Sequence, residues 1–181
     1  MLIDYKVGGG GALGWRELVK SKPDGHTMAG FNIPHIILQP LQQEVGYKTE
    51  QIVPVALFQR TPLGLAVLET SPFKTLQEFV DYAKINPGSI TIGGSGTFSG
   101  HHTASLRLEK LSGAKFTYVP FTGAAPQTTA FLGGHVAAMF GNSDDLVRYK
   151  EKIRVLAFAS GERFPDFPAS PTSSASSDSG C

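Results

Sequence analysis

Apolar and polar positions repeat along the chain with two periods, and each period predicts a different kind of element. Period-two alternation and short apolar runs predict strands, expected at 2–7, 26–31, 52–57, 63–68, 89–93, 115–119, 135–140 and 154–160. Apolar residues spaced three and four apart predict amphipathic helices, expected within 12–22, 75–86, 101–111, 127–134 and 142–152. Residues 35–50 are ambiguous between helix and loop. Strands that alternate with helices favour an α/β layer with a mostly parallel sheet.

The helix after Thr75 has the clearest boundaries. Thr75 and Glu78 fit a capping box, in which the threonine accepts the N3 amide and the glutamate reaches back to the N-cap amide. Apolar residues then recur at i, i+3, i+4 and i+7 from Leu76. Asn-Pro-Gly at 86–88 predicts the end of this helix.

Composition and charge exclude several classes of protein. The 181 residues are 41% hydrophobic and 17% charged, and 16 basic against 15 acidic side chains leave a net charge of +1. This apolar fraction suffices for a packed core, and the near-zero charge argues against nucleic acid or an anionic membrane as the main partner. No run approaches the roughly 18 apolar residues of a membrane helix. A single cysteine, Cys181, excludes an internal disulfide. The Ser-rich residues 168–181 predict a disordered tail.

Gly9, Gly11 and Gly14 match the G-x-G-x-x-G dinucleotide fingerprint in form. That fingerprint also needs an acidic residue at the end of the next strand to hold the ribose, and the strand expected at 26–31 is followed by Asn32. A tight turn that lets a helix pack close to its strand is therefore the favoured interpretation. An NAD(P)-binding enzyme remains the alternative.

Two loops rich in small and hydroxylated residues precede helices. In 93–102, Ser95, Thr97 and Ser99 supply hydroxyl groups next to the free amides of a helix N-terminus, which suits a carboxylate or phosphate. The alternative is a capped helix with a flexible preceding loop. Residues 119–127 repeat the layout, so both loops are expected to flank one crevice at the carboxyl edge of the sheet.

The five histidines show no zinc-ligand spacing. His101 and His102 point to different sides of a helix and cannot chelate as an i, i+4 pair, so surface or packing roles are expected for them. His35 follows Asn32-Ile33-Pro34 just past an expected strand end, where polar ligand contacts are common. No nucleophile–base set is visible, so we expect a binding protein without catalytic activity, cofactor or metal.

Seven stretches, in order and spacing, resemble the tripartite tricarboxylate transporter receptor family, the Bug-type extracytoplasmic solute-binding proteins. Residues 73–102 carry the strongest similarity, and the resemblance spans about 2–168. The other stretches are 7–14, 22–27, 31–41, 52–58, 118–136 and 153–168.

The resemblance implies a type II periplasmic-binding-protein fold with two α/β lobes of mostly parallel sheets. A small carboxylate, whether a di- or tricarboxylate, an aromatic acid or an amino acid, would be bound between the lobes and delivered to a membrane permease in the periplasm. The ligand contacts it implies are Ser95, Gly96, Thr97, Ser99, Thr122 and Gly123 from the second lobe, and Asn32 and His35 from the first.

Departures from the family pattern indicate a truncation at both ends. Residues 1–69 would be a partial first lobe ending in a crossover strand, 70–152 the second lobe, 153–167 the return crossover strand and 168–181 the tail. The exported leader, the first strand and its glycine-rich loop have no counterpart, so the first lobe is expected to be incomplete. Because part of the first lobe is missing, we expect this chain to bind its ligand weakly or not at all. A form without an exported leader would remain cytoplasmic. A truncated non-functional remnant is a second alternative.

Overall fold

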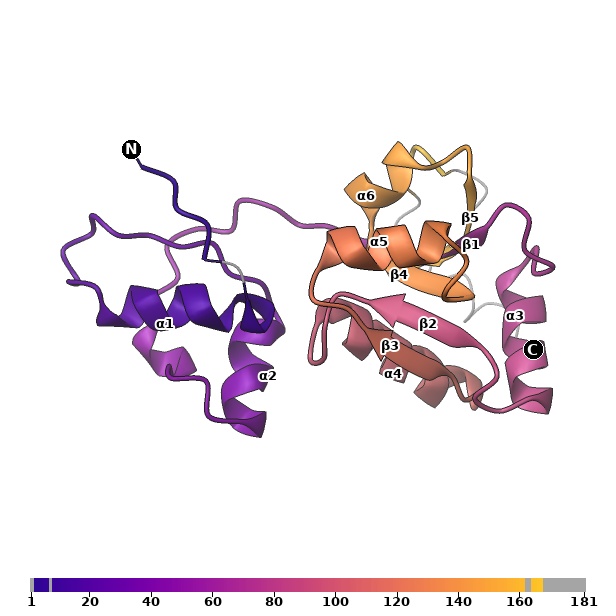
Figure 1. Cartoon of the computed structure of the whole chain (residues 1–181), viewed down its shortest axis with the longest axis horizontal. Helices are drawn as coiled ribbons and strands as arrows, with labels where there is room; N and C mark the ends of the chain where they lie inside the picture. The colour runs from indigo at the N-terminus through magenta and orange to yellow at the C-terminus, as the bar shows by residue number, and fades with distance from the viewer. Residues whose placement is uncertain (1, 7, 162–163, 168–181) are drawn as a thin grey trace.

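A five-stranded sheet with helices on both faces forms the C-terminal part of the chain (Figure 1). The computed structural model describes residues 2–6, 8–161 and 164–167. The strand order is β3-β2-β4-β1-β5. The strands are β1 Leu63–Leu68, β2 Thr91–Gly94, β3 Thr117–Pro120, β4 Ala138–Asn142 and β5 Ile153–Phe158.

The sheet contains parallel and antiparallel strand pairs, and the strand directions bring the ends of four strands to one edge of the sheet. β2 runs parallel to β3 and β4, whereas β1 runs antiparallel to β4 and β5. The predicted α/β class is confirmed, with the antiparallel pairs confined to β1. Because Leu63 pairs with Asn142, the start of β1 lies at the same edge as the carboxyl end of β4. The carboxyl ends of β2 and β3 share that edge.

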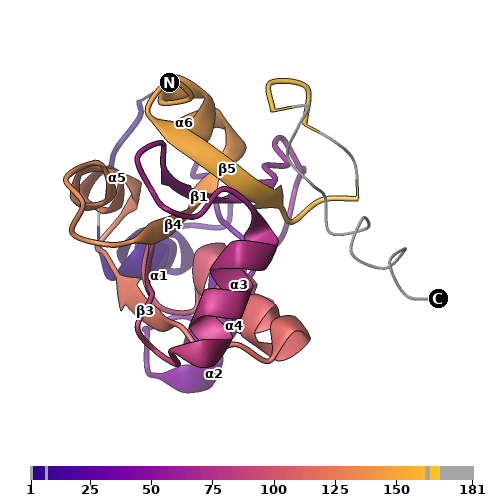
Figure 2. The ribbon, with the colours of Figure 1, turned by 90° about the vertical axis from the view of Figure 1, so that its right-hand side faces the viewer.

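Two helical layers cover the sheet and bury one core cluster each (Figure 2). α3 (Leu76–Ile85) and α4 (Gly100–Ser112) lie on one face. α5 (Ala124–Leu132) and α6 (Ser143–Arg148) lie on the other. The alternation within β1 shows the division, since Leu65 and Val67 belong to the first cluster and Ala66 to the second. This is the period-two pattern of a strand buried on both sides.

The predicted caps are present with one difference. Thr75 Oγ1 accepts the Glu78 N–H at 3.2 Å, as the capping box requires. The Glu78 carboxylate, however, accepts the N–H of Lys74 at 2.7 Å, one residue before the predicted partner. At the end of α4, Gly113 adopts the left-handed φ of 72° that closes a helix.

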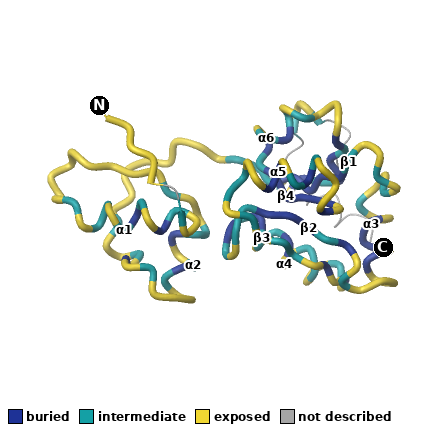
Figure 3. Tube along the Cα trace, in the orientation of Figure 1, coloured by how far each residue is buried: buried dark blue, intermediate teal, exposed yellow. Residues whose placement is uncertain are grey.

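The N-terminal part has a smaller core. α1 (Ala12–Lys20) and α2 (His35–Gln42) are joined by irregular segments and by 3-10 turns at Gly9–Gly11 and Thr49–Gln51. Trp15 and Tyr47 meet edge to face with ring centres 5.7 Å apart, and the Trp15 Nε1–H donates to the Gly30 carbonyl at 3.0 Å. Figure 3 shows far fewer buried positions here than in the sheet.

Three predicted strands are wrong. The described part of 2–7 and the segments 26–31 and 52–57 contain no strand. Each has the apolar alternation of a strand, but a strand needs a neighbour to accept its hydrogen bonds, and none of the three pairs with another described segment. Many of their apolar side chains stay in solvent; Val53, Val55 and Leu57 are 80%, 85% and 84% exposed. Phe31 and Ile52 pack partly against the N-terminal core.

The helices of the described residues are all too short or too polar to cross a membrane. The predicted tail, 168–181, lies outside the described residues.

We predict that the triple variant Val53→Thr, Val55→Thr, Leu57→Thr associates less and binds less hydrophobic dye than the unmodified chain. Contiguous exposed apolar side chains promote association, while substitutions at exposed positions change the free energy of unfolding by about 0.5 kcal/mol or less each. Light scattering after size exclusion, dye fluorescence and the melting temperature test this. The matched control, Val67→Thr in the buried core, should melt earlier. Unchanged association of the triple variant would refute the prediction.

Candidate functional site

The loop between β2 and α4 is closed by its own hydroxyl groups. Ser99 is the N-cap of α4 and is only 1% exposed. Its Oγ accepts the His102 N–H at 3.1 Å and donates to the Gly96 carbonyl at 2.9 Å. Ser99, expected from the sequence as a ligand contact, therefore uses its hydroxyl inside the loop. Thr97 is exposed, and Ser95 and Gly96 are partly exposed.

Ser95 is held by the imidazole of His101, the second residue of α4. The Ser95 N–H and hydroxyl lie 3.1 and 3.0 Å from His101 Nδ1. A backbone N–H can only donate, so Nδ1 is the acceptor and the proton of the neutral ring resides on Nε2. Nε2 faces Asn142 Oδ1 at 3.4 Å, at the end of β4. His101 thus links the loop to a neighbouring strand.

Burial keeps His101 neutral. Desolvation lowers the pKa of His101 from 6.5 to about 4, and the charge of nearby His35 lowers it further, against the opposing effect of hydrogen bonds with Asn142 and Gln127. At neutral pH the ring is therefore an acceptor at Nδ1 and a donor at Nε2.

Two further rings hold the middle of the loop. Phe98 has φ of 59°, a left-handed conformation that costs a non-glycine residue about 1–3 kcal/mol. Its N–H donates to His102 Nδ1 at 3.2 Å, which stabilises that conformation. Tyr118 of β3 donates its hydroxyl to the Gly96 carbonyl at 2.8 Å, and its ring centre lies 4.5 Å from that of His102.

The second loop lies directly beside the first. The Phe121 N–H donates to the Gly94 carbonyl at 2.8 Å. The following helix, α5, begins at Ala124, and its N-cap residue Gly123 offers no side chain to cap it. Helix geometry leaves the N–H groups of Ala124 and Ala125 without helical partners, and an added Cβ at Gly123 would meet nothing within 4 Å. Thr122 is exposed next to them. This helix end is open to an anion.

The N-terminal part brings His35 to the first loop. Burial lowers the pKa of His35 below its ordinary value, against the smaller opposing effect of the neighbouring Ser95 backbone. Its Nδ1 is buried and has no partner among the described residues. Asn32 is exposed, and its carbonyl accepts the Ile36 N–H at 3.1 Å at the start of α2. His35 thus reaches the loop, whereas the contact found for Asn32 is with its own helix.

The glycine turn at 8–11 is filled by the protein itself. Gln39 Nε2 donates to the Gly9 carbonyl at 3.0 Å, and the Tyr47 hydroxyl donates to Gln39 Oε1 at 3.3 Å. No strand precedes the turn within the described residues 2–6. The strand–turn–helix context of a dinucleotide site is therefore not found, and the turn serves packing of α1.

Sequence reasoning missed the residues that hold the loops in place. His101 was expected to have a surface or packing role, and Tyr118, Gln127 and Asn142 were not singled out. One sequence signal could have found them: two adjacent histidines at the start of a helix that follows a Gly-Ser loop. His101 accepts the N–H of the residue six positions before it, and His102 that of the residue four positions before it. Over the described residues, no three His, Cys, Asp or Glu side chains are grouped to hold a metal ion.

Comparisons with known proteins agree on one family. The family model "Tripartite tricarboxylate transporter family receptor" matches residues 1–180. The UPF0065 protein in the gbd 5'region of Cupriavidus necator is 30% identical over 178 residues, covering 95% of this chain and 53% of that protein. The chain thus spans about half the length of this curated relative.

Two solved structures with bound carboxylates are similar. MatC from Rhodopseudomonas palustris with bound malate is 27% identical, with a TM-score of 0.79 over 93% of this chain and 58% of MatC. An R. palustris protein with adipate is 26% identical, with a TM-score of 0.86 over 97% of this chain and 60% of that one.

We predict that the chain loses stability as the pH falls from 6.5 toward 4. The unfolded chain binds a proton at His101 in this range and the folded chain does not, so stability is full above pH 6.5. A folded pKa of about 4 against the ordinary 6.5 corresponds to about 3 kcal/mol. Denaturant titrations across this range test it. His101→Asn, which cannot titrate, should show a shallower loss, and an equal loss in both proteins would contradict the assignment.

Proposed function

The chain belongs to the tripartite tricarboxylate transporter receptor family, and from this premise we propose that it is a solute-binding receptor component of such a transporter. It captures a small carboxylate between two lobes in the periplasm and delivers it to the membrane permease subunits. It binds its ligand without transforming it. In this proposal 1–69 is a partial first lobe ending in a crossover strand, 70–152 is the second lobe and 153–167 is the return crossover strand.

The observation that carries this proposal is the pairing of two helix N-termini. The hydrogen bond from Phe121 to the Gly94 carbonyl holds the loops before α4 and α5 together. The start of α5 has no side-chain cap, and Thr97 and Thr122 are exposed beside the two helix ends. Neutral N–H and hydroxyl donors next to two helix dipoles suit a carboxylate.

The ligand contacts we propose follow from which donors remain available. Gly96, Thr97, Thr122 and Gly123 form the carboxylate side of the site. Ser95 and Ser99 line the same loop, with Ser99 acting mainly as its cap. Asn32 and His35 approach from the N-terminal part, and the unpartnered, buried Nδ1 of His35 is the polar atom best placed to receive a ligand group.

We propose a small dicarboxylate as the ligand class. Two similar proteins were solved with malate and adipate, both dicarboxylic acids. A dicarboxylate places one anionic end at the helix N-termini and leaves the other to the opposing lobe. The alternative of NAD(P) binding at Gly9, Gly11 and Gly14 receives no support from the comparisons, and Gln39 already occupies the carbonyls of that turn.

We predict a dose-dependent thermal stabilisation by malate or adipate. With a dissociation constant of about 1 mM, weak for such a site, 10 mM ligand contributes about 1.4 kcal/mol, or roughly 3–6 °C. Butyrate, with one carboxylate, and NAD serve as controls and should give little shift. A flat response to every dicarboxylate with a cooperative melt would count against the receptor proposal, and a shift with NAD alone would favour the enzyme.

We predict that Gly123→Asp abolishes this stabilisation. The new carboxylate would cap the open N–H groups of α5 and repel an anionic ligand, while an Asp cap raises helix stability by a few tenths of a kcal/mol. The unliganded melting temperature should therefore hold or rise slightly. Gly123→Ala is the matched control, since its methyl group meets open space and carries no charge. Full ligand response in Gly123→Asp would place the site elsewhere.

A further inference from the structure

We propose that His101 is a positioning residue for ligand binding, whose neutral imidazole fixes the Ser95 peptide and thereby the donors of the loop before α4. The inference rests on the proposed function and deepens it, because it concerns the same loop. His101 itself is buried, 4% exposed, and lies behind the loop. Its role is therefore exerted through Ser95 rather than by contact with the ligand.

The first step is the geometry around Nδ1. Both donors of Ser95, the N–H and the hydroxyl, converge on this one nitrogen at 3.1 and 3.0 Å. Ser95 therefore turns its donors inward, toward the helix. The next peptide then runs through Gly96, whose φ of 96° lies in the left-handed region. This turn leaves Thr97 exposed at the tip of the loop.

The second step is the anchoring of the ring itself. Nε2 faces the Asn142 side chain at the end of β4, and Gln127 of α5 lies close enough to the ring to act on its pKa. Gln127 is in turn fixed by donating to the Gly93 and Phe140 carbonyls. The ring is thus held by two other elements, so the position of Ser95 is set by the sheet and by α5.

The third step links the two parts of the chain. His35 at the start of α2 also lies beside the Ser95 backbone, which raises the pKa of His35 against the larger effect of burial. The Ser95 peptide is therefore held by His101 and approached by His35. Of the groups that bond to the His101 ring or act on its pKa, His35 is the titratable one; Ser95, Gln127 and Asn142 carry no charge.

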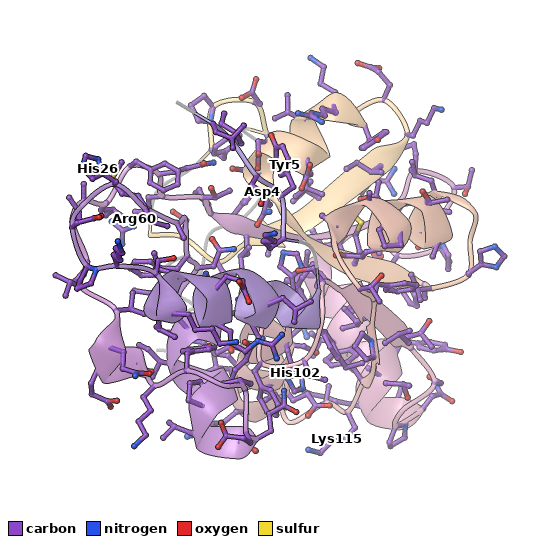
Figure 4. All side chains as sticks on the ribbon, turned by 60° about the vertical axis from the view of Figure 1, so that its left-hand side comes forward. Asp4, Tyr5, His26, Arg60, His102 and Lys115 are labelled. Carbon is purple, nitrogen blue, oxygen red and sulfur yellow. The ribbon has the colours of Figure 1, made fainter. Side chains whose placement is uncertain are left out.

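The test compares two substitutions at His101. His101→Asn keeps an acceptor near the position of Nδ1 but cannot be protonated, and His101→Leu keeps bulk without an acceptor. His26→Asn is the control, since His26 is exposed and lies at the periphery of the N-terminal part (Figure 4). The readouts are the NMR-derived affinity for adipate at pH 7.5 and the hydrogen-exchange rate of the Ser95 amide.

We expect His101→Leu to weaken adipate binding at least tenfold and to speed Ser95 exchange at least tenfold. His101→Asn should stay within about threefold of the unmodified chain in both readouts at pH 7.5. A merely structural role would lower the melting temperature of both variants without separating their Ser95 exchange rates.

Unchanged Ser95 exchange in His101→Leu overturns the positioning role, as does Ser95 exchange in His101→Asn as fast as in His101→Leu. Absence of adipate and malate binding by the unmodified chain overturns the proposed function instead. In that case the exchange rate of the Ser95 amide still decides whether His101 holds the loop.

Discussion

Backbone N–H groups at the start of a helix must find a partner, and the site depends on which of them the protein satisfies itself. At α4, the Ser99 hydroxyl takes one of these donors, while imidazole nitrogens take the N–H groups of Ser95 and Phe98 in the loop before it. At α5, Gly123 provides no side chain and leaves the first amides open. The proposed anion site rests on this contrast between a closed loop and an open helix start, which one backbone hydrogen bond holds together.

The sheet determines where these loops meet. Parallel pairing of β2 with β3 and β4 aligns three carboxyl ends, and the antiparallel direction of β1 adds the segment that arrives from the N-terminal part. Two separate core clusters, one on each face, hold the sheet rigid. The site therefore stands on the best-packed region of the chain, and its N-terminal neighbours stand on a core of four buried residues.

Elements that local chemistry determines were predictable from the sequence. The Thr75 cap, the stripe of α3 and Gly113 at the end of α4 each depend on residues within one or two turns. The strands expected at 2–7, 26–31 and 52–57 failed because a strand depends on a distant partner, which apolar alternation does not report. In the site, the Gly-Ser loop at 95–99 was found from composition, whereas the role of His101 depends on ring orientation and on Asn142, 41 residues away.

The entry of β1 beside the site has a mechanical consequence. The irregular stretch 52–62 joins the N-terminal part to β1 at Leu63, next to Asn142 (Figure 1). A rotation about this stretch would have its pivot close to the candidate site, and displacement grows with distance from a pivot. The loop at 95–99 would shift little, while the distal turn around His26 would sweep the widest arc. Spectroscopic labels that report such a rotation belong at that distal end. The displacement there is larger than at the loop 95–99, where the same rotation would be too small to resolve.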